Sequence, residues 1–545
     1  MQHLIENPFI EFAAILITSA VFGALGRLLK QPLIVAFIAA GIIIGPSGLN
    51  LIRSLDQIHL LAEIGISILL FVVGLKLDIN LIRSTGIVST LTGLGQVVFT
   101  SIFGFLIGKL LGYDHLQALY IAVALTFSST IIIVKLLSDK KEIDSLHGQI
   151  AVGFLIIQDI VVVIMMIFLS ALGAGKGESM AFDVLFVFLK GIGVLAIVGL
   201  LMKYVLPGLL KKLADSAELL VLFSVSWAIL LAAAGEIMGF SKEVGAFVAG
   251  ISLASSHYRE IISGRLIGLR DFLLLFFFIN LGSQLDLSLL GAQITNSLIF
   301  SLFVLIGNPL IVLLIMGLMG YRKRTSFLAG LTVAQISEFS LILATMGFTL
   351  GHIDSETMGL ITLVGLITIG ISTYMIIYSH QLYNKLSPLL IIFERKIAYR
   401  ETDDKAYKGE SVDVIIFGLG RYGKNIAKSL DRQNYKILGV DFDPKLVSLW
   451  QNKGKLAQYA DVEDPEITTI LPLEKAKFVI STISDVTINL SLLKYLKEAN
   501  FKGKIALTVH HNRDAERLNK AGADIILFPF VDAASHIIKK LSHNE

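Results

Sequence analysis

The 545-residue sequence contains no cysteine. Disulfides, thiol catalysis and cysteine-ligated metal clusters are therefore excluded. Charged residues are also scarce, because Asp, Glu, Lys and Arg make up 16% of the chain, against about a quarter in ordinary soluble proteins. Hydrophobic residues account for 54%. These figures exclude an ordinary soluble protein and indicate a chain that crosses a lipid bilayer several times. The formal net charge of +3 gives no indication of a nucleic-acid partner.

Long apolar stretches recur along residues 1–385. A membrane-spanning helix needs about 20 mainly apolar residues, and by that rule we expect about thirteen spans. They are centred at 9–26, 33–48, 60–73, 87–108, 116–134, 148–172, 184–206, 219–235, 244–256, 272–285, 297–319, 327–350 and 358–378. Segments 116–172 and 327–378 both place polar residues inside adjacent apolar stretches, which is typical of an inverted repeat. Residues 1–385 are thus predicted to form a polytopic α-helical membrane domain.

Basic residues cluster in alternate loops between these stretches. With the N-terminus placed outside, the inner loops hold Arg27, Lys30, Lys76, Arg83, Lys140, Lys141, Lys211, Lys212, Arg259, Arg265, Arg270, Arg322, Lys323, Arg324, Arg395 and Lys396. The opposite loops, at 46–55, 173–182, 236–242 and 351–356, hold far fewer. This asymmetry follows the positive-inside rule, and an odd number of spans then puts the C-terminus in the cytoplasm. We expect a multi-pass protein of the cell (inner) membrane.

The composition changes after the last apolar stretch. Residues 386–411 form a polar, charged linker, and from residue 412 short apolar strands alternate with amphipathic helices. The strand candidates are VDVIIFG, YKILGVD, LAQYAD, KFVISTI, KIALTVH and DIILF. Strands that alternate with crossover helices indicate a doubly wound parallel sheet. Residues 412–545 are therefore predicted to form a Rossmann-like α/β cytoplasmic domain.

A glycine motif opens this second domain. Gly418, Gly420 and Gly423 form G-x-G-x-x-G directly after a predicted strand, and Asp441 ends the next strand. This order of strand, glycines, helix and acidic residue is the dinucleotide-binding fingerprint. Phosphates would lie at the helix N-terminus, and Asp441 would hold ribose hydroxyls. The alternative is a Rossmann fold that has lost its ligand.

The apolar stretch at 148–172 is interrupted near its middle by Gln158 and Asp159. A charged side chain at the centre of a spanning helix costs about 2.5–3.5 kcal/mol on insertion scales, which favours a functional role as an ion or proton site. The alternative is an Asp that bonds a neighbouring helix for structure alone. Because burial favours the neutral form of a carboxyl group, Asp159 could carry a proton and a cation in turn, which is the property of an antiporter.

Three further polar groups fall inside predicted spans. They are Thr126, Ser128, Ser129 and Thr130 in the preceding stretch, Asn308 before Pro309, and Gln335 with Glu338. The atoms that these side chains offer to a metal ion are hydroxyl, amide and carboxylate oxygens. Such ligands suit a hard cation and argue against a transition metal. The alternatives are helix–helix hydrogen bonds for the hydroxyl groups and a simple kink at Pro309.

At this point the sequence resembles a known family. The stretches GFLIIQDIVVV, VGAFVAG, LLLFFFINLGSQLDL and AQISEFSLIL, with the fold that follows them, resemble the monovalent cation:proton antiporter-2 family, most closely its Kef-type potassium/proton antiporters. The resemblance implies thirteen spans, a homodimer, and broken fifth and twelfth helices that cross near an ion site at Asp159 and Gln158. Gln158 favours potassium, since sodium-selective relatives more often carry an acidic residue or Asn there. Asn308 stands where many relatives have lysine, which leaves the proton:ion stoichiometry open.

The C-terminal domain resembles the RCK/KTN (TrkA-N) regulatory domain of potassium transporters and channels. That resemblance implies that Arg421, Tyr422, Asp443 and Asp461 also line the nucleotide pocket. No residue in the domain is suited to hydride transfer. We therefore expect an adenine nucleotide (AMP, ADP, ATP or NAD(H)) as a regulatory ligand, and an accessory regulatory subunit is a further partner that the resemblance allows.

Together these features predict a secondary antiporter, and not an enzyme, that exchanges K⁺ for protons under nucleotide control. A sodium/proton antiporter of the same fold is the alternative. An RCK-gated potassium channel is disfavoured, because the sequence has no TVGYG-like carbonyl filter and a channel does not need a carboxylate at the midplane.

Overall fold

The computed structural model describes residues 8–51, 54–76, 86–173, 193, 196–238, 240–285, 287–395, 412–464 and 467–542. The chain divides into two compact units. The first consists of Met1–Lys140, Ile150–Ile315 and Phe327–Leu386, and the second of Lys141–Gln149, Met316–Ser326 and Ser387–Glu545. The second unit therefore includes two short segments from the membrane-domain sequence, in addition to the C-terminal domain.

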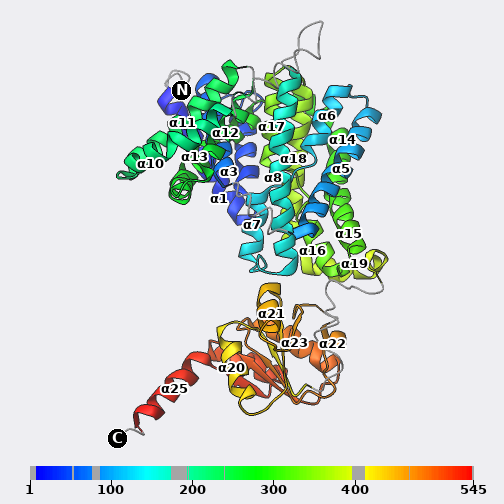
Figure 1. The fold of residues 1–545 in the computed structure, drawn as a ribbon. Coiled ribbons are helices and arrows are strands. Elements are labelled where there is room, and N and C mark those ends of the chain that lie inside the picture. Colours follow the sequence, from blue (N-terminus) through cyan, green and yellow to red (C-terminus); the bar gives the residue numbers. More distant parts are fainter. Residues whose placement is uncertain are drawn as a thin grey trace. The chain divides into compact units, whose positions relative to one another are not determined.

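All regular secondary structure in the described part of residues 8–393 is helical (Figure 1). The helices are α1 (Pro8–Leu28), α2 (Leu33–Ile44), α3 (Leu55–Lys76), α5 (Gly86–Leu110), α6 (His115–Ala124), α7 (Thr130–Asp139), α8 (Leu146–Gly173), α10 (Leu206–Leu213), α11 (Ala217–Ile237), α12 (Lys242–Ala254), α13 (Arg259–Ser283), α14 (Leu287–Leu302), a π-helical turn (Phe303–Gly307), α15 (Asn308–Leu318), α16 (Lys323–Leu331), α17 (Glu338–Thr349), α18 (Ser355–Ile377), α19 (Ser379–Leu390) and a 3₁₀ turn (Ile391–Phe393).

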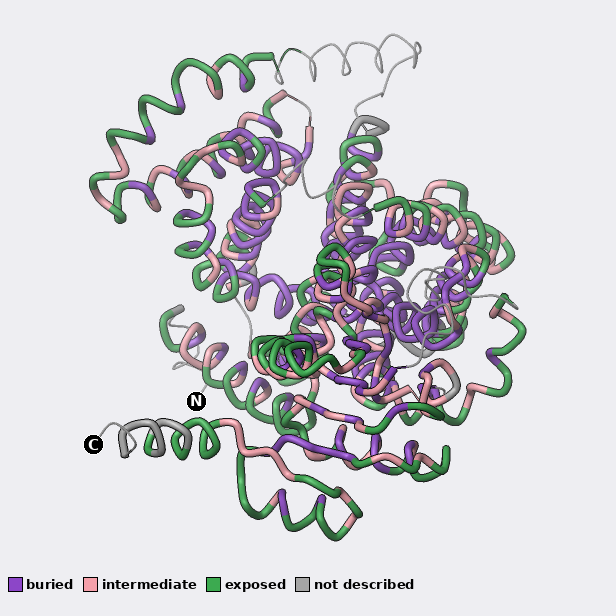
Figure 2. Tube along the Cα trace, turned by 60° about the horizontal axis from the view of Figure 1, so that its bottom comes forward, coloured by how far each residue is buried: buried purple, intermediate pink, exposed green. Residues whose placement is uncertain are grey.

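Eight of the described helices are long and apolar enough to cross a membrane, and three more are apolar but shorter. The expected total of thirteen spans stays a prediction, because residues 184–192 and 194–195 of the stretch at 184–206 lie outside the described residues. Large apolar side chains such as Ile87, Leu110 and Leu222 point outward, with 72%, 86% and 62% of their surface exposed. Figure 2 shows the buried residues running along the inner helices. Apolar outer faces of this kind suit contact with lipid.

Two predicted spans are broken in the middle. The stretch at 116–134 is divided between α6 and α7, which are separated by residues 125–129, and the stretch at 327–350 is divided between α16 and α17, which are separated by residues 332–337. Every residue in both breaks is buried. Each second half begins at a serine cap: Ser129 Oγ accepts from Ile132 N (3.3 Å), and Ser337 Oγ accepts from Phe339 N (3.2 Å). Caps of this type let a helix restart after the backbone leaves the helical ladder.

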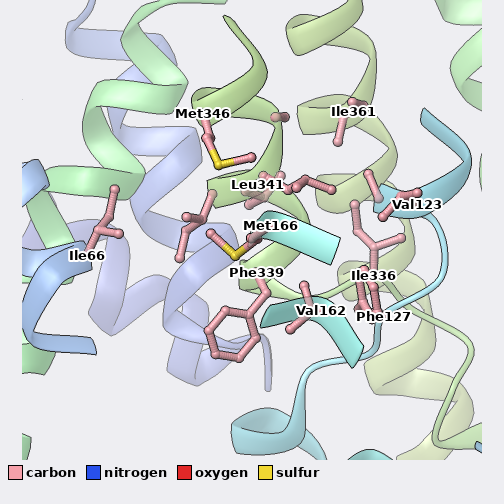
Figure 3. Packing of buried hydrophobic residues seen from close by; sticks show 14 of the residues in the cluster. Ile66, Val123, Phe127, Val162, Met166, Ile336, Phe339, Leu341, Met346 and Ile361 are labelled. Atoms are coloured by element: carbon pink, nitrogen blue, oxygen red, sulfur yellow. The ribbon is translucent and has the colours of Figure 1, made fainter. Parts of the chain in front are cut away.

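The two breaks pack with α8 in the largest hydrophobic cluster. Figure 3 shows Phe127 and Ile336, one from each break, with Val162 and Met166 of α8 and Phe339 of α17 in this cluster. Apolar packing therefore fixes both interrupted segments against the middle of α8. The polar groups of the breaks are held within a rigid interior.

Glycines let several helices of the first unit approach closely. A Cβ atom added at Gly282 of α13 would overlap the carbonyl oxygen of Ile38 on α2, and one at Gly250 of α12 would overlap that of Phe71 on α3. Small residues at such crossings allow backbone-to-backbone packing, which is a main source of helix association in membranes.

The second unit contains a six-stranded parallel sheet with the order β3-β2-β1-β4-β5-β6. Its elements are β1 (Val414–Phe417), α20 (Arg421–Asp431), β2 (Ile437–Asp441), α21 (Pro444–Gln451), β3 (Ala457–Tyr459), α22 (Ile467–Ile470), β4 (Phe478–Ser481), α23 (Val486–Glu498), β5 (Lys504–Thr508), α24 (Asn512–Ala521), β6 (Ile525–Leu527) and α25 (Pro529–Ser542). The predicted doubly wound sheet is confirmed. The strand order reverses between β1 and β4, and ligands of such sheets bind at this switch point.

The glycine crossings yield a stability prediction. We expect Gly282→Ala to lower the free energy of unfolding by about 1–3 kcal/mol, because the new methyl group forces α2 and α13 apart. Gly264→Ala, on the same helix but with nothing near its Cβ position, is the matched control and should be neutral or slightly stabilising. Thermal unfolding of the purified protein in detergent measures both variants. Equal melting temperatures for the two would contradict the close-packing interpretation.

Candidate functional site

Asp159 lies on α8, beside the restart of the first broken helix. Thr130, the first residue of α7, donates a hydrogen bond from Oγ1 to Asp159 Oδ2 (2.9 Å). The half-buried Asp159 side chain therefore sits at a helix N-terminus, where the helix dipole favours negative charge. Of the ion pairs that the described residues form, none involves Asp159.

Glu338 brings a second carboxyl group to the same place. It is the first residue of α17 and only 2% exposed. Its side chain accepts from Ser337 Oγ (3.5 Å) and lies close to the Ser129 hydroxyl. Ser129 and Thr130 are neighbours at the start of α7, so Asp159 and Glu338 both lie near this helix end and are close enough to interact electrostatically. Two acidic groups and two half-helix N-termini thus meet at one point.

Gln158 faces away from this carboxylate pair and supports the broken backbone. Its Oε1 accepts from the backbone N–H of Ser128 (3.2 Å), and its Nε2 donates to Gln96 Oε1 (2.7 Å). Asn308 behaves similarly, because its Nδ2 donates to the carbonyl of Leu125 (3.3 Å). Both amides are completely buried. They satisfy backbone groups that the break between α6 and α7 leaves without helical partners.

Gln96 and Thr100 of α5 complete this set, and the sequence analysis missed them. Gln96 Nε2 donates to the carbonyl of Thr126 (3.1 Å), and Thr100 Oγ1 donates to Asn308 Oδ1 (2.7 Å). The available signal was a glutamine and a threonine four residues apart in an apolar span, which places both on one helix face.

The remaining predicted residues of the membrane site have different surroundings. Thr126 Oγ1 bonds back to the carbonyl of Ala122 (2.9 Å). Gln335 Oε1 accepts from Ser372 Oγ (2.7 Å) on α18. Ser128 Oγ is buried and has no hydrogen-bond partner among the described residues. The structure therefore bonds Thr130 to Asp159 and places Glu338 near Asp159 and Ser129.

The glycine motif forms a tight turn after β1. Gly418 has φ +91°, which favours glycine, and a Cβ atom at Gly423 would overlap the Gly418 carbonyl. Gly420 caps α20 and has open space around its Cβ position. Arg421 and Tyr422 occupy the first turn of α20. The N-terminus of α20 is thus accessible for a phosphate group.

Asp441 ends β2 next to this turn. Its carboxylate accepts from the backbone N–H groups of Leu419 (2.6 Å) and Asp443 (2.9 Å) and is 6% exposed. Burial raises the pKa of Asp441 above its ordinary value, although the two N–H groups oppose that shift. The position of Asp441 beside the glycine turn agrees with the predicted fingerprint.

Asp443 and Asp461 both contact segments that precede the C-terminal domain in sequence. Asp443 caps α21 and accepts from Gln149 Nε2 (3.1 Å). Asp461 forms an ion pair with Arg324 Nη1 (2.6 Å). Burial alone would raise the pKa of Asp461, but the guanidinium of Arg324 holds it below its ordinary value. Gln149 and Arg324 belong to the two short segments that the second unit includes.

Comparison with known proteins agrees with this arrangement. The model of the family described as "Sodium/hydrogen exchanger, transmembrane" matches residues 15–377, and that of the TrkA-N domain matches residues 414–529. The "Putative K(+) efflux antiporter KefB" of Alkalimonas amylolytica is 26% identical over 522 residues, which cover 94% of this chain and 78% of that protein. The "Iron transporter MagA" of Paramagnetospirillum magneticum (strain ATCC 700264 / AMB-1) is 30% identical over 379 residues, 68% of this chain and 85% of that protein.

Among solved structures, the sodium proton antiporter MjNhaP1 from Methanocaldococcus jannaschii is 17% identical, with a TM-score of 0.49, and covers 72% of this chain and 99% of its own. The exchanger match alone spans well over half of the chain. The predicted likeness to cation:proton antiporters with a C-terminal TrkA-N domain is confirmed. The chain belongs to the sodium/hydrogen exchanger family, as a multi-pass cation/proton antiporter that carries a TrkA-N domain after its membrane helices.

Proposed function

We propose that this antiporter exchanges K⁺ for protons, and that Asp159 carries the cation and the proton in turn. The observation that carries this proposal is the position of Asp159 at the N-terminus of α7, hydrogen-bonded to Thr130 and without a permanent cationic partner among the described residues. An intramembrane carboxylate with no fixed counter-ion needs a mobile one. A proton or a transported cation supplies that charge.

The cation would be held by oxygens around the break between α6 and α7. Asp159 and Thr130 would supply two of them, and the buried Ser128 Oγ, which has no hydrogen-bond partner among the described residues, would supply a third. This donor set contains no nitrogen or sulfur ligand, so it suits an alkali cation better than iron. K⁺ is preferred to Na⁺ on two grounds, the Gln158 that precedes Asp159 and the K⁺ efflux named for the relative from Alkalimonas amylolytica.

Two opposing effects would let a proton displace the cation. Burial in a membrane interior favours the neutral carboxylic acid, whereas the α7 N-terminus and the Thr130 hydroxyl favour the carboxylate. When the two effects are similar in size, Asp159 can both release and bind a proton. Protonation of an Asp159 oxygen then removes the charge that holds the cation, and the cation leaves. Loss of that proton restores the site. Asn308 is neutral and adds no fixed positive charge to this polar region.

We further propose that an adenine nucleotide at the β1–α20 turn regulates exchange. Asp441 would hold the ribose and the N-terminus of α20 the phosphates. The segments Lys141–Gln149 and Met316–Ser326 lead directly into α8 and α16, and they contact Asp443 and Asp461. Asp461 would then serve as an anchor for Arg324 more than as a nucleotide ligand. Nucleotide binding near Asp443 would change its contact with Gln149, near the start of the helix that carries Asp159.

The remaining features of the sequence prediction complete the proposal. The membrane domain would comprise residues 1–385, the linker 386–411, of which 396–411 lie outside the described residues, and the regulatory domain 412–545. The N-terminus would be outside and the C-terminal domain in the cytoplasm. Two copies would form a homodimer.

The Asp159→Asn variant tests the exchange mechanism. An amide neither releases a proton nor balances a cation, so we expect K⁺-dependent proton flux in proteoliposomes to fall to background. Asp56→Asn, in the exposed first turn of α3, is the control and should retain full flux. Flux measured with K⁺, Na⁺ and Li⁺ in turn decides the cation. Normal cation-dependent proton flux in Asp159→Asn would remove this residue from the mechanism.

The Gly420→Asp variant tests nucleotide binding. The open space around Gly420 accepts a side chain, but a carboxylate there would repel a phosphate at the α20 N-terminus. We expect the affinity for AMP or NAD(H), measured by calorimetry on the full-length protein, to fall about tenfold or more. Asp514→Asn, on the first turn of α24, is the control. Unchanged affinity in Gly420→Asp, or no measurable affinity in the unmodified protein, would indicate a fold without its ligand.

The ion pair between Arg324 and Asp461 yields a prediction about coupling. We expect Arg324→Ala and Asp461→Asn each to abolish the effect of nucleotide on proton flux, and the double variant to show no further loss, because the two residues act as one contact. Nucleotide affinity should stay within about twofold of the original value. Since Arg324 keeps the pKa of Asp461 low, the pair stays ionised across physiological pH and separates only in more acidic solution. Preserved nucleotide control in both single variants would contradict this coupling.

A further inference from the structure

A continuous chain of hydrogen bonds connects α15 to α8 through α5. Thr100 Oγ1 donates to Asn308 Oδ1 (2.7 Å), Gln96 Nε2 donates to Thr100 Oγ1 (3.0 Å), and Gln158 Nε2 donates to Gln96 Oε1 (2.7 Å). All four side chains are fully buried. Gln96 and Thr100 are four residues apart on α5, whereas the other two bonds join residues that are far apart in sequence.

The direction of every bond in this chain is fixed by the backbone of the first break. The carbonyls of Leu125 and Thr126 can only accept, and they accept from Asn308 Nδ2 (3.3 Å) and Gln96 Nε2 (3.1 Å). At the other end, the N–H of Ser128 can only donate, and it donates to Gln158 Oε1 (3.2 Å). Rotating any one amide by half a turn would set acceptor against acceptor or donor against donor.

This series of hydrogen bonds therefore fixes the backbone geometry of residues 125–128. Its groups do not titrate near neutral pH, so it holds the broken backbone without adding charge next to Asp159. The segment it holds ends at Ser128, whose Oγ has no hydrogen-bond partner among the described residues, and Thr130 two positions later bonds Asp159. A shift of this segment would move Ser128 and the Thr130 hydroxyl that bonds the carboxylate.

We infer that Gln96 and Thr100 are positioning residues for the cation site. They orient the Gln158 amide and the Leu125 and Thr126 carbonyls, so that Ser128 and Thr130 present their hydroxyl groups at a fixed distance from Asp159. Selection between cations of different radius depends on such fixed ligand positions. This inference rests on the proposed exchange at Asp159, and it assigns the two α5 residues a role in cation affinity and selectivity.

Thr100→Val is the sharpest test. Valine keeps the shape of threonine but removes the hydroxyl that links Gln96 to Asn308. We expect the KM for K⁺ to rise about tenfold, the preference for K⁺ over Na⁺ to weaken, and kcat to change by less than about twofold, since a buried donor and acceptor lose their partners. Thr100→Ser restores a hydroxyl and should return KM and selectivity to near the original values.

Thr92→Val provides a matched control on the same helix. Thr92 is also completely buried, and its Oγ1 has no hydrogen-bond partner among the described residues, so the same substitution there should leave KM and selectivity unchanged. Gln96→Met, of similar length but unable to hydrogen-bond, is a second variant and should raise KM at least as much as Thr100→Val. Both are measured as cation-dependent proton flux in proteoliposomes, with reconstituted protein quantified.

The outcomes separate this inference from the proposed function. If the unmodified protein shows no Asp159-dependent cation/proton exchange, the proposed function fails. If that exchange is present but Thr100→Val and Gln96→Met keep the original KM and K⁺/Na⁺ ratio, the positioning role is wrong. A reduced kcat with unchanged KM and selectivity would indicate a purely structural role and would also overturn the inference.

Discussion

A backbone that leaves the helical ladder inside a membrane has no water to bond, so the protein must supply every partner. The break between α6 and α7 meets this constraint through side chains from three other helices. Amides from α5, α8 and α15 bond the backbone at Leu125, Thr126 and Ser128. Once those partners are in place, the N-terminus of α7 is fixed opposite Asp159. The proposed chemistry depends on this arrangement, because a helix end can favour a carboxylate only if it is held close to it.

The same constraint explains why Gln158 and Asp159, which are adjacent in sequence, make different contacts. Gln158 and Asp159 are neighbours in an apolar helix, but Gln158 bonds the broken backbone and Asp159 bonds the helix that restarts after it. Gln158 holds the broken backbone, and Asp159 is the proposed exchange site. Glu338 repeats the pattern from the second break, where it begins α17 and lies close to Ser129. The two interrupted helices thus share a polar centre inside a hydrophobic cluster.

Local sequence patterns predicted the elements whose structure depends on residues close together in the chain. Spans follow from apolar length, and the glycine turn with Asp441 follows from the spacing of a strand and a helix. What escaped prediction depends on residues far apart in the chain. Thr126 and Thr130 look alike in sequence, yet the Thr126 hydroxyl bonds Ala122 and Ser101, whereas the Thr130 hydroxyl bonds Asp159. Gln96 lies in an apolar stretch, and its partners come from the distant break beside it and from Gln158. The nucleotide-pocket role of Asp461 stays a prediction, whereas its ion pair with Arg324, 137 positions away, was not predicted.

The helix α8 runs from Leu146 to Gly173 without interruption. Its first residues belong to the unit that contains the Rossmann-like domain. Gln149 and Asp159 are ten positions apart on it, about 15 Å along the axis. Thermodynamic linkage makes any such coupling reciprocal. If an occupied nucleotide site weakens or strengthens cation binding by some factor, a bound cation must change nucleotide affinity by the same factor. The fraction of regulatory domains with bound nucleotide would then also depend on the concentration of the cation that the transporter carries.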